Sequence, residues 1–301
     1  REIFFWSIIF SILFSVLLSY LFSRLAIRPI SQIIRRIQAI NPAQLNYRLD
    51  VRNIQDEIGK LAISFNEMLA NIEQAFTNQD EFVSNASHEL RTPLAVMIAE
   101  SDYLLSRARS PQEYVEHISN TIVDLKRLNS LLYSLLELAQ LKHSTSIELT
   151  NVRMDEAIYT AIQQVKTVHL GRRVIVKINY PDDENDLLAA ANPRLLDIAF
   201  KNLLDNACKF SEDEILTEMS VGDGKIIIAI SDRGSGIPPD EVDNIFNPFN
   251  RATNVRLKAG FGIGLAMVFK IIKLHGAEIK VNSVQHKGTQ FVLVFNTAKK
   301  D

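Results

Sequence analysis

The sequence is poor in cysteine, with Cys208 as the single one among 301 residues. One thiol excludes an internal disulfide and a zinc site built from cysteines, and it fits a reducing compartment. The formal net charge is −2, so the chain as a whole is not expected to bind nucleic acid. The phosphate-loop pattern G-x-x-x-x-G-K-[ST] is absent, as are the H-R-D and D-F-G motifs of the protein kinases. Neither of those two common ATP-binding folds is therefore expected.

Charge is also absent from residues 3–22, a run of twenty residues near the start of the sequence. At 1.5 Å per residue this run matches about 30 Å of hydrocarbon, which predicts a transmembrane helix over residues 1–23. A secretory signal peptide is the alternative, but its apolar core would be shorter and a small-residue cleavage site would follow. The first residue is Arg rather than Met, so we expect a piece of a longer or processed protein. The arginines that follow the run place its C-terminal side in the cytoplasm: Arg24, Arg28, Arg35 and Arg36.

Two short heptad patterns follow the span, and a polar stretch over residues 43–55 separates them. The first pattern comes after Pro29, and the second opens at the D-E-I-G of residues 56–59. Their apolar residues recur at steps of three and four, which is typical of coiled-coil seams: Ile30, Ile33, Ile37, Ile40, then Ile58, Leu61, Phe65, Met68, Ile72. Next to a membrane span, this pattern resembles a HAMP linker, which we place at residues 24–76. A plain coiled-coil stalk is the alternative, and it would likewise pass a small helix movement inward.

A helical hairpin is expected over residues 77–145. One apolar stripe ends before Arg109, and Ser110 to Glu113 then form a capping box with proline at the first helical position. The expected stripes are Leu90, Leu94, Met97 and Leu104, then Ile118, Ile122, Leu125, Leu128, Leu132 and Leu135. Two antiparallel amphipathic helices cannot bury both of their apolar faces alone. We therefore expect a four-helix bundle formed by two copies of the chain.

The hairpin carries the stretch S-H-E-L-R-T-P, in which His88 and Glu89 are adjacent. His88 lies about 200° around the helix from Leu90, so it should face away from the apolar stripe. An exposed imidazole is a fair nucleophile when a neighbouring carboxylate accepts its ring proton. Thr92 shares the face of His88, and Pro93 removes a backbone donor one turn later, which predicts a hinge. A lone helical histidine is more often inert, so the rest of the chain must decide its role.

The pattern changes at about residue 146. Short β-rich runs at residues 174–178, 225–230, 278–281 and 290–295 alternate with helical stretches, which predicts an α+β sandwich over residues 146–301. One of those helices carries Asn202, Asn206 and Lys209 on one face, where two amides and an ammonium would suit a magnesium ion and phosphates.

Three further clusters follow this helix. Asp232, with Gly234 and Gly236, comes directly after a strand, where its carboxylate can accept the exocyclic amine of adenine. Phe249 and Arg251 offer an aromatic anchor and a cation. The third cluster, the glycines Gly260, Gly262 and Gly264, could cradle phosphate at a helix start, and Gly288-Thr289 closes the set. Any one glycine cluster is weak evidence, but this order and spacing is highly specific.

Taken together, these segments resemble the sensor histidine kinases of two-component systems, and the resemblance covers nearly the whole sequence. It implies a Bergerat-fold ATP-binding domain, ATP and Mg²⁺ as ligands, a homodimer, and a bacterial inner membrane location with the region after about residue 24 in the cytoplasm. It makes His88 the phosphoacceptor, Glu89 its base, and Thr92 the residue that orients water in the reverse, phosphatase reaction. Asn206 would hold magnesium. The implied ATP-binding set is Asn202, Asn206, Lys209, Phe210, Asp232, Gly234, Gly236, Phe249, Arg251, Gly260, Gly262, Gly264, Leu265 and Thr289.

Two other functions remain to be weighed. ATP-hydrolysing relatives of the gyrase and Hsp90 type carry a glutamate four residues before the metal-binding asparagine, whereas this sequence has Asn202 there, and an amide is no base at neutral pH. A membrane adaptor with a degenerate nucleotide site is opposed by the intact Asn206 and Asp232. No receiver domain fits after Phe295, so the phosphoryl group is expected to pass to a separate response regulator.

Overall fold

The computed structural model describes residues 2–38, 47–49, 57–143, 147–255 and 260–298. The chain divides into two compact units, residues 1–84 and 85–301, and each is considered by itself. The side chains of the expected seam from Ile30 to Ile40 lie outside the described part, as do Arg256 and Lys258, which precede the glycine cluster at Gly260.

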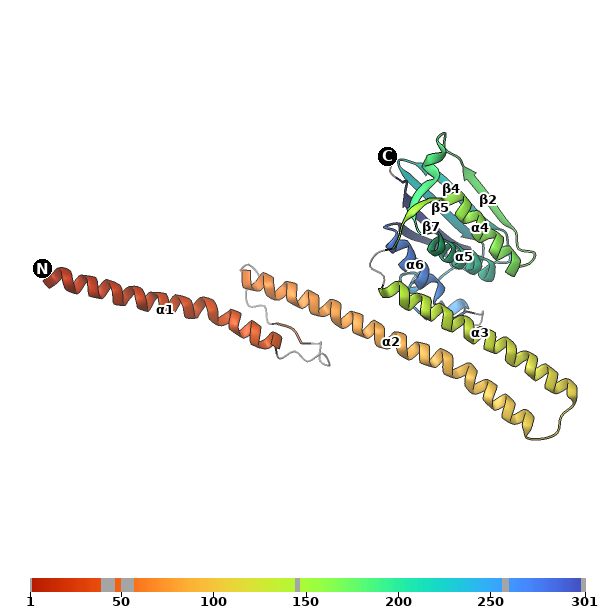
Figure 1. The fold of residues 1–301 in the computed structure, drawn as a ribbon, viewed down its shortest axis with the longest axis horizontal. Coiled ribbons are helices and arrows are strands. Elements are labelled where there is room, and N and C mark those ends of the chain that lie inside the picture. The colour runs from red at the N-terminus through yellow and green to blue at the C-terminus, as the bar shows by residue number, and fades with distance from the viewer. Residues whose placement is uncertain (1, 39–46, 50–56, 144–146, 256–259, 299–301) are drawn as a thin grey trace. The chain divides into compact units, whose positions relative to one another are not determined.

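The first unit opens with α1 (Glu2–Gln38), the red helix of Figure 1. Its stretch Glu2–Arg24 is long and apolar enough to cross a bilayer, and no part of the tested stretch is buried within the chain. An apolar helix that the protein leaves uncovered matches the transmembrane span that the sequence predicts.

A short extended segment, residues 47–49, packs on the first turns of α2 (Glu57–Leu105). Asn66 holds this segment by its backbone: the Leu49 N–H donates to Asn66 Oδ1 at 2.8 Å, and Asn66 Nδ2 donates to the Leu49 carbonyl at 2.9 Å. Leu49 itself is 4% exposed. An ion pair between Arg48 and Glu73, 2.5 Å long, lies on the same side. Three of the five predicted seam residues of α2 are between 37% and 55% exposed, which leaves part of that face uncovered: Leu61, Met68 and Ile72.

In the second unit, the rest of α2 and α3 (Pro111–His143) form the predicted hairpin. The capping box is confirmed: the Ser110 N–H donates to Glu113 Oε2 at 2.8 Å, and the Glu113 N–H donates to Ser110 Oγ at 3.3 Å. Lower in the hairpin, Ser101 Oγ lies 3.0 Å from His117 Nε2, so the two helices touch through a polar pair. The prediction of two antiparallel helices is correct.

The predicted apolar stripes are only partly buried within the hairpin. Met97 of α2 and Leu131 of α3 are buried, whereas Leu94 is 49% exposed. The reason is that both helices carry apolar residues on more than one face, and the hairpin contact covers only one of them. Four residues of the predicted α3 stripe lie on the uncovered side: Ile118, Ile122, Leu125 and Leu132.

The C-terminal domain is an α+β sandwich, as predicted. Its five-stranded sheet has the order β2-β4-β5-β7-β6, in which β2 is parallel to β4 and all other neighbours are antiparallel. A separate antiparallel pair joins β1 to β3. The elements are β1 (Thr150–Arg153), α4 (Met154–Val168), β2 (Val174–Asn179), η1 (Glu184–Leu187), β3 (Leu188–Ala191), α5 (Pro193–Phe210), β4 (Ile215–Gly222), β5 (Lys225–Asp232), η2 (Val242–Asn244), η3 (Thr253–Val255), α6 (Gly264–Leu274), β6 (Glu278–Val284) and β7 (Gly288–Asn296).

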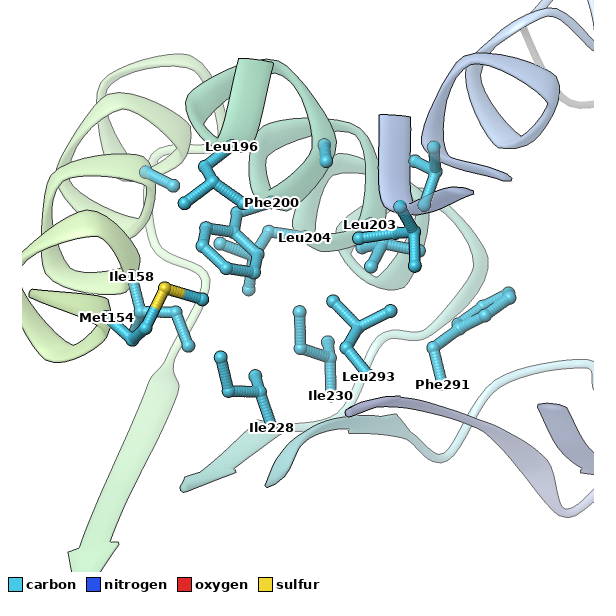
Figure 2. Close-up of a cluster of buried hydrophobic side chains, with 14 of the residues drawn as sticks. Met154, Ile158, Leu196, Phe200, Leu203, Leu204, Ile228, Ile230, Phe291 and Leu293 are labelled. Atoms are coloured by element: carbon cyan, nitrogen blue, oxygen red, sulfur yellow. The ribbon is translucent and has the colours of Figure 1, made fainter. Parts of the chain in front are cut away.

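The core lies between this sheet and the helices that cover one of its faces. Alternate residues of β5 point inward, so Ile228 and Ile230 are buried while Ile227 remains partly exposed. Figure 2 shows these strand residues facing Phe200 of α5 and Met154 of α4. The packing fixes α5 over the sheet and thereby places its polar face beside the end of β5.

α5 begins as a well-capped helix. The Leu195 N–H donates to Asn192 Oδ1 at 3.1 Å, and Pro193 takes the first helical position, where no backbone donor is needed. The helix continues to Phe210. Its length carries Asn202, Asn206 and Lys209 past the core to the rim of the domain.

Candidate active site

A cavity of about 410 Å³ opens at one end of the C-terminal domain. α5, the end of β5, the start of α6 and the segment between them form most of its wall, and β7 and α3 of the hairpin contribute the remaining residues. Most of the predicted nucleotide-binding residues line it: Asn202, Asn206, Lys209, Phe210, Asp232, Gly236, Arg251, Gly260, Gly262, Gly264, Leu265 and Thr289. The structure thus brings together predicted residues that lie up to about ninety positions apart in the sequence.

Two predicted binding residues do not line this cavity. Gly234 packs against α5 instead, since a Cβ atom at this position would collide with the Phe210 carbonyl oxygen. Phe249 has a φ of +66°, and its N–H donates to the Gly262 carbonyl at 2.9 Å. The aromatic anchor of this segment is Phe246, whose ring centroid lies 5.0 Å from that of Phe269 on α6. Gly234 and Phe249 therefore shape the walls of the site from behind.

Asp232 ends β5 at the floor of the cavity, opposite Thr289 of β7. Its Oδ1 accepts a hydrogen bond from the Gly234 N–H at 2.8 Å. Burial raises the pKa of the Asp232 carboxyl above its ordinary value, and the backbone N–H groups of Gly234 and Thr289 oppose that rise in part. A half-buried carboxylate with one oxygen bound by backbone is well placed to accept a donor from a ligand.

The polar face of α5 is organised by its own hydrogen bonds. Asn202 Nδ2 donates to the Ile198 carbonyl at 2.8 Å, which turns its Oδ1 toward the start of α6. A Cβ atom on Gly264 would lie 2.5 Å from that oxygen, so a larger residue there would require the Asn202 side chain to shift. Since Ile263 has no polar side chain to cap α6, the first amides of this helix are well suited to an anion.

Sequence reasoning missed Asp205, which also lines the cavity. Its carboxylate lies 2.5 Å from Lys209 Nζ and 2.6 Å from His169 Nε2. The available signal was its position, next to Asn206 and four residues before Lys209 on the same helix. Asp205 therefore fixes the ammonium group of Lys209 at the edge of the cavity.

Three residues of α3 were missed as well: Arg127, Ser130 and Ser134 line the same cavity. The guanidinium Cζ of Arg127 lies 5.2 Å from the ring centroid of Phe261, between the two glycines Gly260 and Gly262. No motif marks these residues, because only their spacing of three and four on one helix face relates them.

His88 and Glu89 are exposed on α2, as predicted, while Pro93 is incorporated in an unbroken helix. Thr92 Oγ1 donates to the His88 carbonyl at 3.1 Å, so its hydroxyl group is engaged by its own helix. His88 is not among the described residues that line the cavity.

We expect Gly236→Ala to destabilise the domain strongly. Gly236 has a φ of +61°, and a Cβ atom there would collide with the Val284 carbonyl oxygen. Gly171→Ala is the matched control, because Gly171 also has a positive φ, +87°, but no atom within 4 Å of its Cβ position. Urea unfolding followed by circular dichroism should show Gly236→Ala less stable than the control by about 1–3 kcal/mol. Equal stability of the two variants would contradict this account of the loop.

Comparison with known families agrees with this architecture. Three family models match in order: the HAMP domain at residues 21–74, the His Kinase A (phospho-acceptor) domain at 78–144, and the histidine kinase-, DNA gyrase B-, and HSP90-like ATPase at 191–299. The chain thus carries a HAMP domain, a phospho-acceptor domain and a histidine kinase-type ATPase domain in this order. The signal transduction histidine-protein kinase ArlS of Staphylococcus aureus (strain USA300) is 30% identical over 275 residues, which are 89% of this chain and 60% of the relative.

Solved histidine kinases share the fold. The Acinetobacter baumannii histidine kinase AdeS matches with a TM-score of 0.56 and 18% identity, over 70% of this chain and 98% of that one. Full-length ShkA, solved in complex with AMPPNP, matches with a TM-score of 0.50 and 22% identity, over 73% of this chain and 47% of that one. The chain spans 60% of the length of the curated relatives that it matches.

Proposed function

We propose that the chain is an ATP-dependent protein-histidine kinase that phosphorylates His88 and passes the phosphoryl group to an aspartate of a separate response regulator. The observation that carries this proposal is the cavity, which gathers Asn206, Lys209, Asp232 and the glycine segment around one space. The exposed His88-Glu89 pair on the hairpin supplies the acceptor. Both halves of a phosphotransfer reaction are thus present in one chain.

Each wall of the cavity suits a different part of ATP. Asp232 accepts the exocyclic amine of adenine at the floor, and the amides at the start of α6 face the phosphates. Lys209 and Arg251 supply positive charge at the rim. Asn206 presents an amide oxygen, a ligand that Mg²⁺ accepts, and Asn202 lies one turn before it; a bound Mg²⁺ would neutralise part of the phosphate charge.

In the transfer step, an imidazole nitrogen of His88 forms a bond to the γ-phosphorus of ATP while the bond from that phosphorus to the β–γ bridging oxygen breaks. ADP leaves with the electron pair of that bond, and Glu89 takes the proton of the other ring nitrogen. The opposing function, a gyrase- or Hsp90-like ATPase, needs a base for water at residue 202. Asn202 is an amide whose nitrogen donates a hydrogen bond to the Ile198 carbonyl, so it cannot serve as that base.

The exposed apolar residues of the hairpin support a homodimer. Leu94 of α2 and Ile118, Ile122 and Leu125 of α3 are each about half exposed, although all are large and apolar. A second hairpin packed against them would complete a four-helix bundle. With α1 as its anchor, the dimer would lie in the bacterial inner membrane with its remaining domains, including residues 24–76, 77–145 and 146–301, in the cytoplasm.

Two regulatory roles belong to the same proposal. Thr92 would orient water for dephosphorylation of the regulator, which requires its hydroxyl to leave the His88 carbonyl. Pro93 offers no N–H to the carbonyl one turn before it, so α2 is weakest there and can bend when the span moves.

The test is phosphorylation of the detergent-solubilised chain with γ-³²P-ATP and Mg²⁺, followed by addition of a candidate regulator. We expect the chain to take up label that is acid-labile and alkali-stable, and we expect this label to move to the regulator. A chain that binds ATP but takes up no label would instead be an adaptor or a phosphatase.

A further inference from the structure

We propose that Arg127 of α3 is a further phosphate-binding residue, so that the hairpin completes the nucleotide site of the catalytic domain. The inference rests on the proposed ATP binding and adds a ligand that comes from outside the ATP-binding domain. It starts from one face of α3, where Arg127, Ser130 and Ser134 line the same cavity as the nucleotide-binding residues. An arginine and two hydroxyl groups on one helix face are a set of donors that suits phosphate.

Arg127 lies at the phosphate end of the cavity. Its guanidinium group covers the ring of Phe261, with Cζ 5.2 Å from the ring centroid. Phe261 stands three residues before Gly264, where α6 begins and where the Asn202 side chain approaches. The adenine end is marked by Asp232, which lies on β5. Arg127 is therefore associated with the helix start that suits phosphate.

The charge of Arg127 is available to a ligand. Lys209, the cation predicted from the sequence, is held by the Asp205 carboxylate at 2.5 Å. Arg127 has no ion pair with a carboxylate among the described residues, and its guanidinium group contacts the aromatic ring of Phe261. A guanidinium group that stacks on a ring keeps the N–H groups of its edge free to bind an anion in a bidentate manner.

The cavity-lining face of α3 lies at a height along the hairpin axis that fits phosphoryl transfer to His88. The contact between Ser101 and His117 sets the register of the two antiparallel helices. His88 lies thirteen residues before Ser101, and Ser130 lies thirteen residues after His117, so Ser130 and His88 are at about the same height. A nucleotide held by this face of α3 would have its phosphates level with the phosphoacceptor.

One consequence concerns regulation. Because Arg127, Ser130 and Ser134 belong to the hairpin and the ligands predicted from the sequence belong to the catalytic domain, nucleotide binding and docking of the domain on α3 must strengthen each other by the same factor. A movement of α3 would then change nucleotide affinity directly.

The experiment measures equilibrium binding of AMP-PNP and of AMP to the full chain in detergent, for wild type and Arg127→Gln. We expect the affinity for AMP-PNP to fall about tenfold or more, because a charge-assisted contact to the β- or γ-phosphate is lost, while the affinity for AMP is unchanged. Arg127→Lys should restore part of the loss. Phe261→Leu should weaken AMP-PNP binding to a lesser degree, since it removes the ring that supports the guanidinium group. Lys126→Gln is the matched control, because it removes the same charge from an exposed neighbouring position that does not line the cavity.

Two results would overturn the inference. Unchanged AMP-PNP binding by Arg127→Gln would show that the guanidinium group does not contact the phosphates. An equal loss for AMP-PNP and AMP would show a structural role. If the wild-type chain binds neither AMP-PNP nor AMP, the proposed kinase function itself is wrong. That outcome can be told apart from the two results above, because in both of those the wild-type chain binds nucleotide.

Discussion

His88→Gln is expected to remove all acid-labile label from the chain, a loss of at least about a thousandfold, while ATP binding stays at the wild-type level. The physical reason is that glutamine has no nucleophilic ring nitrogen. His88 is exposed on α2 and is not among the described residues that line the cavity, so its replacement should leave the nucleotide site intact. The measurement pairs γ-³²P-ATP labelling with equilibrium binding of AMP-PNP.

A second histidine variant serves as the control. His286 is exposed on the turn between β6 and β7, with a φ of +62°, a backbone conformation that asparagine tolerates. His286→Asn should therefore be labelled like wild type. Label that persists in His88→Gln would place the phosphoacceptor elsewhere, and the interpretation of the hairpin as a phosphotransfer element would have to be abandoned.

The sequence predicted those parts of the fold that local patterns determine. The apolar run of α1, the capping box at Ser110 and the β-rich run of β5 each depend on residues close together in the chain, and each is present in the structure. The strands β1, β3 and β4 were missed. β3 is the four-residue stretch L-A-A-A, which has no β-branched residue, and the apolar residues of β4 alternate with threonine, glutamate and serine, so β4 lacks the continuous apolar run of β5 and β7.

For the site as well, residues within short motifs could be predicted from the sequence, whereas residues brought in from distant parts of the chain could not. Asn202, Asn206 and Asp232 were found because each lies in a short recognisable motif, and the cavity contains all three. Arg127 lies on a helix more than seventy residues before the nearest of them, and only tertiary packing brings it to the cavity. Gly234 illustrates the opposite error. Its motif suggested close approach to the nucleotide, whereas its missing Cβ makes room for the Phe210 carbonyl.

Asp232→Asn is expected to lower ATP affinity by about tenfold to a hundredfold while it stabilises the nucleotide-free domain at neutral pH. Affinity falls because the asparagine side chain keeps one acceptor oxygen for the Gly234 N–H and can present an NH₂ group where the adenine amine needs an acceptor. Equilibrium ATP binding and thermal unfolding of the same sample measure the two effects. Asp240→Asn, at an exposed position outside the cavity, should change neither.

The gain in stability follows from the direction of the pKa shift. Burial raises the pKa of Asp232 in the folded state, so folding favours the protonated carboxyl. This contribution to stability is fully present below the pKa that Asp232 has in the unfolded chain, and it is lost as pH rises through its higher pKa in the folded domain. At neutral pH a buried carboxylate remains, and its burial opposes folding. The melting temperature of Asp232→Asn should therefore exceed that of wild type at pH 7, and the difference should shrink as pH is lowered through the raised pKa. Over the same range wild-type ATP affinity should fall. A variant that is less stable than wild type at pH 7 would mean that the Asp232 carboxylate supports the fold through its backbone hydrogen bonds more than its burial costs.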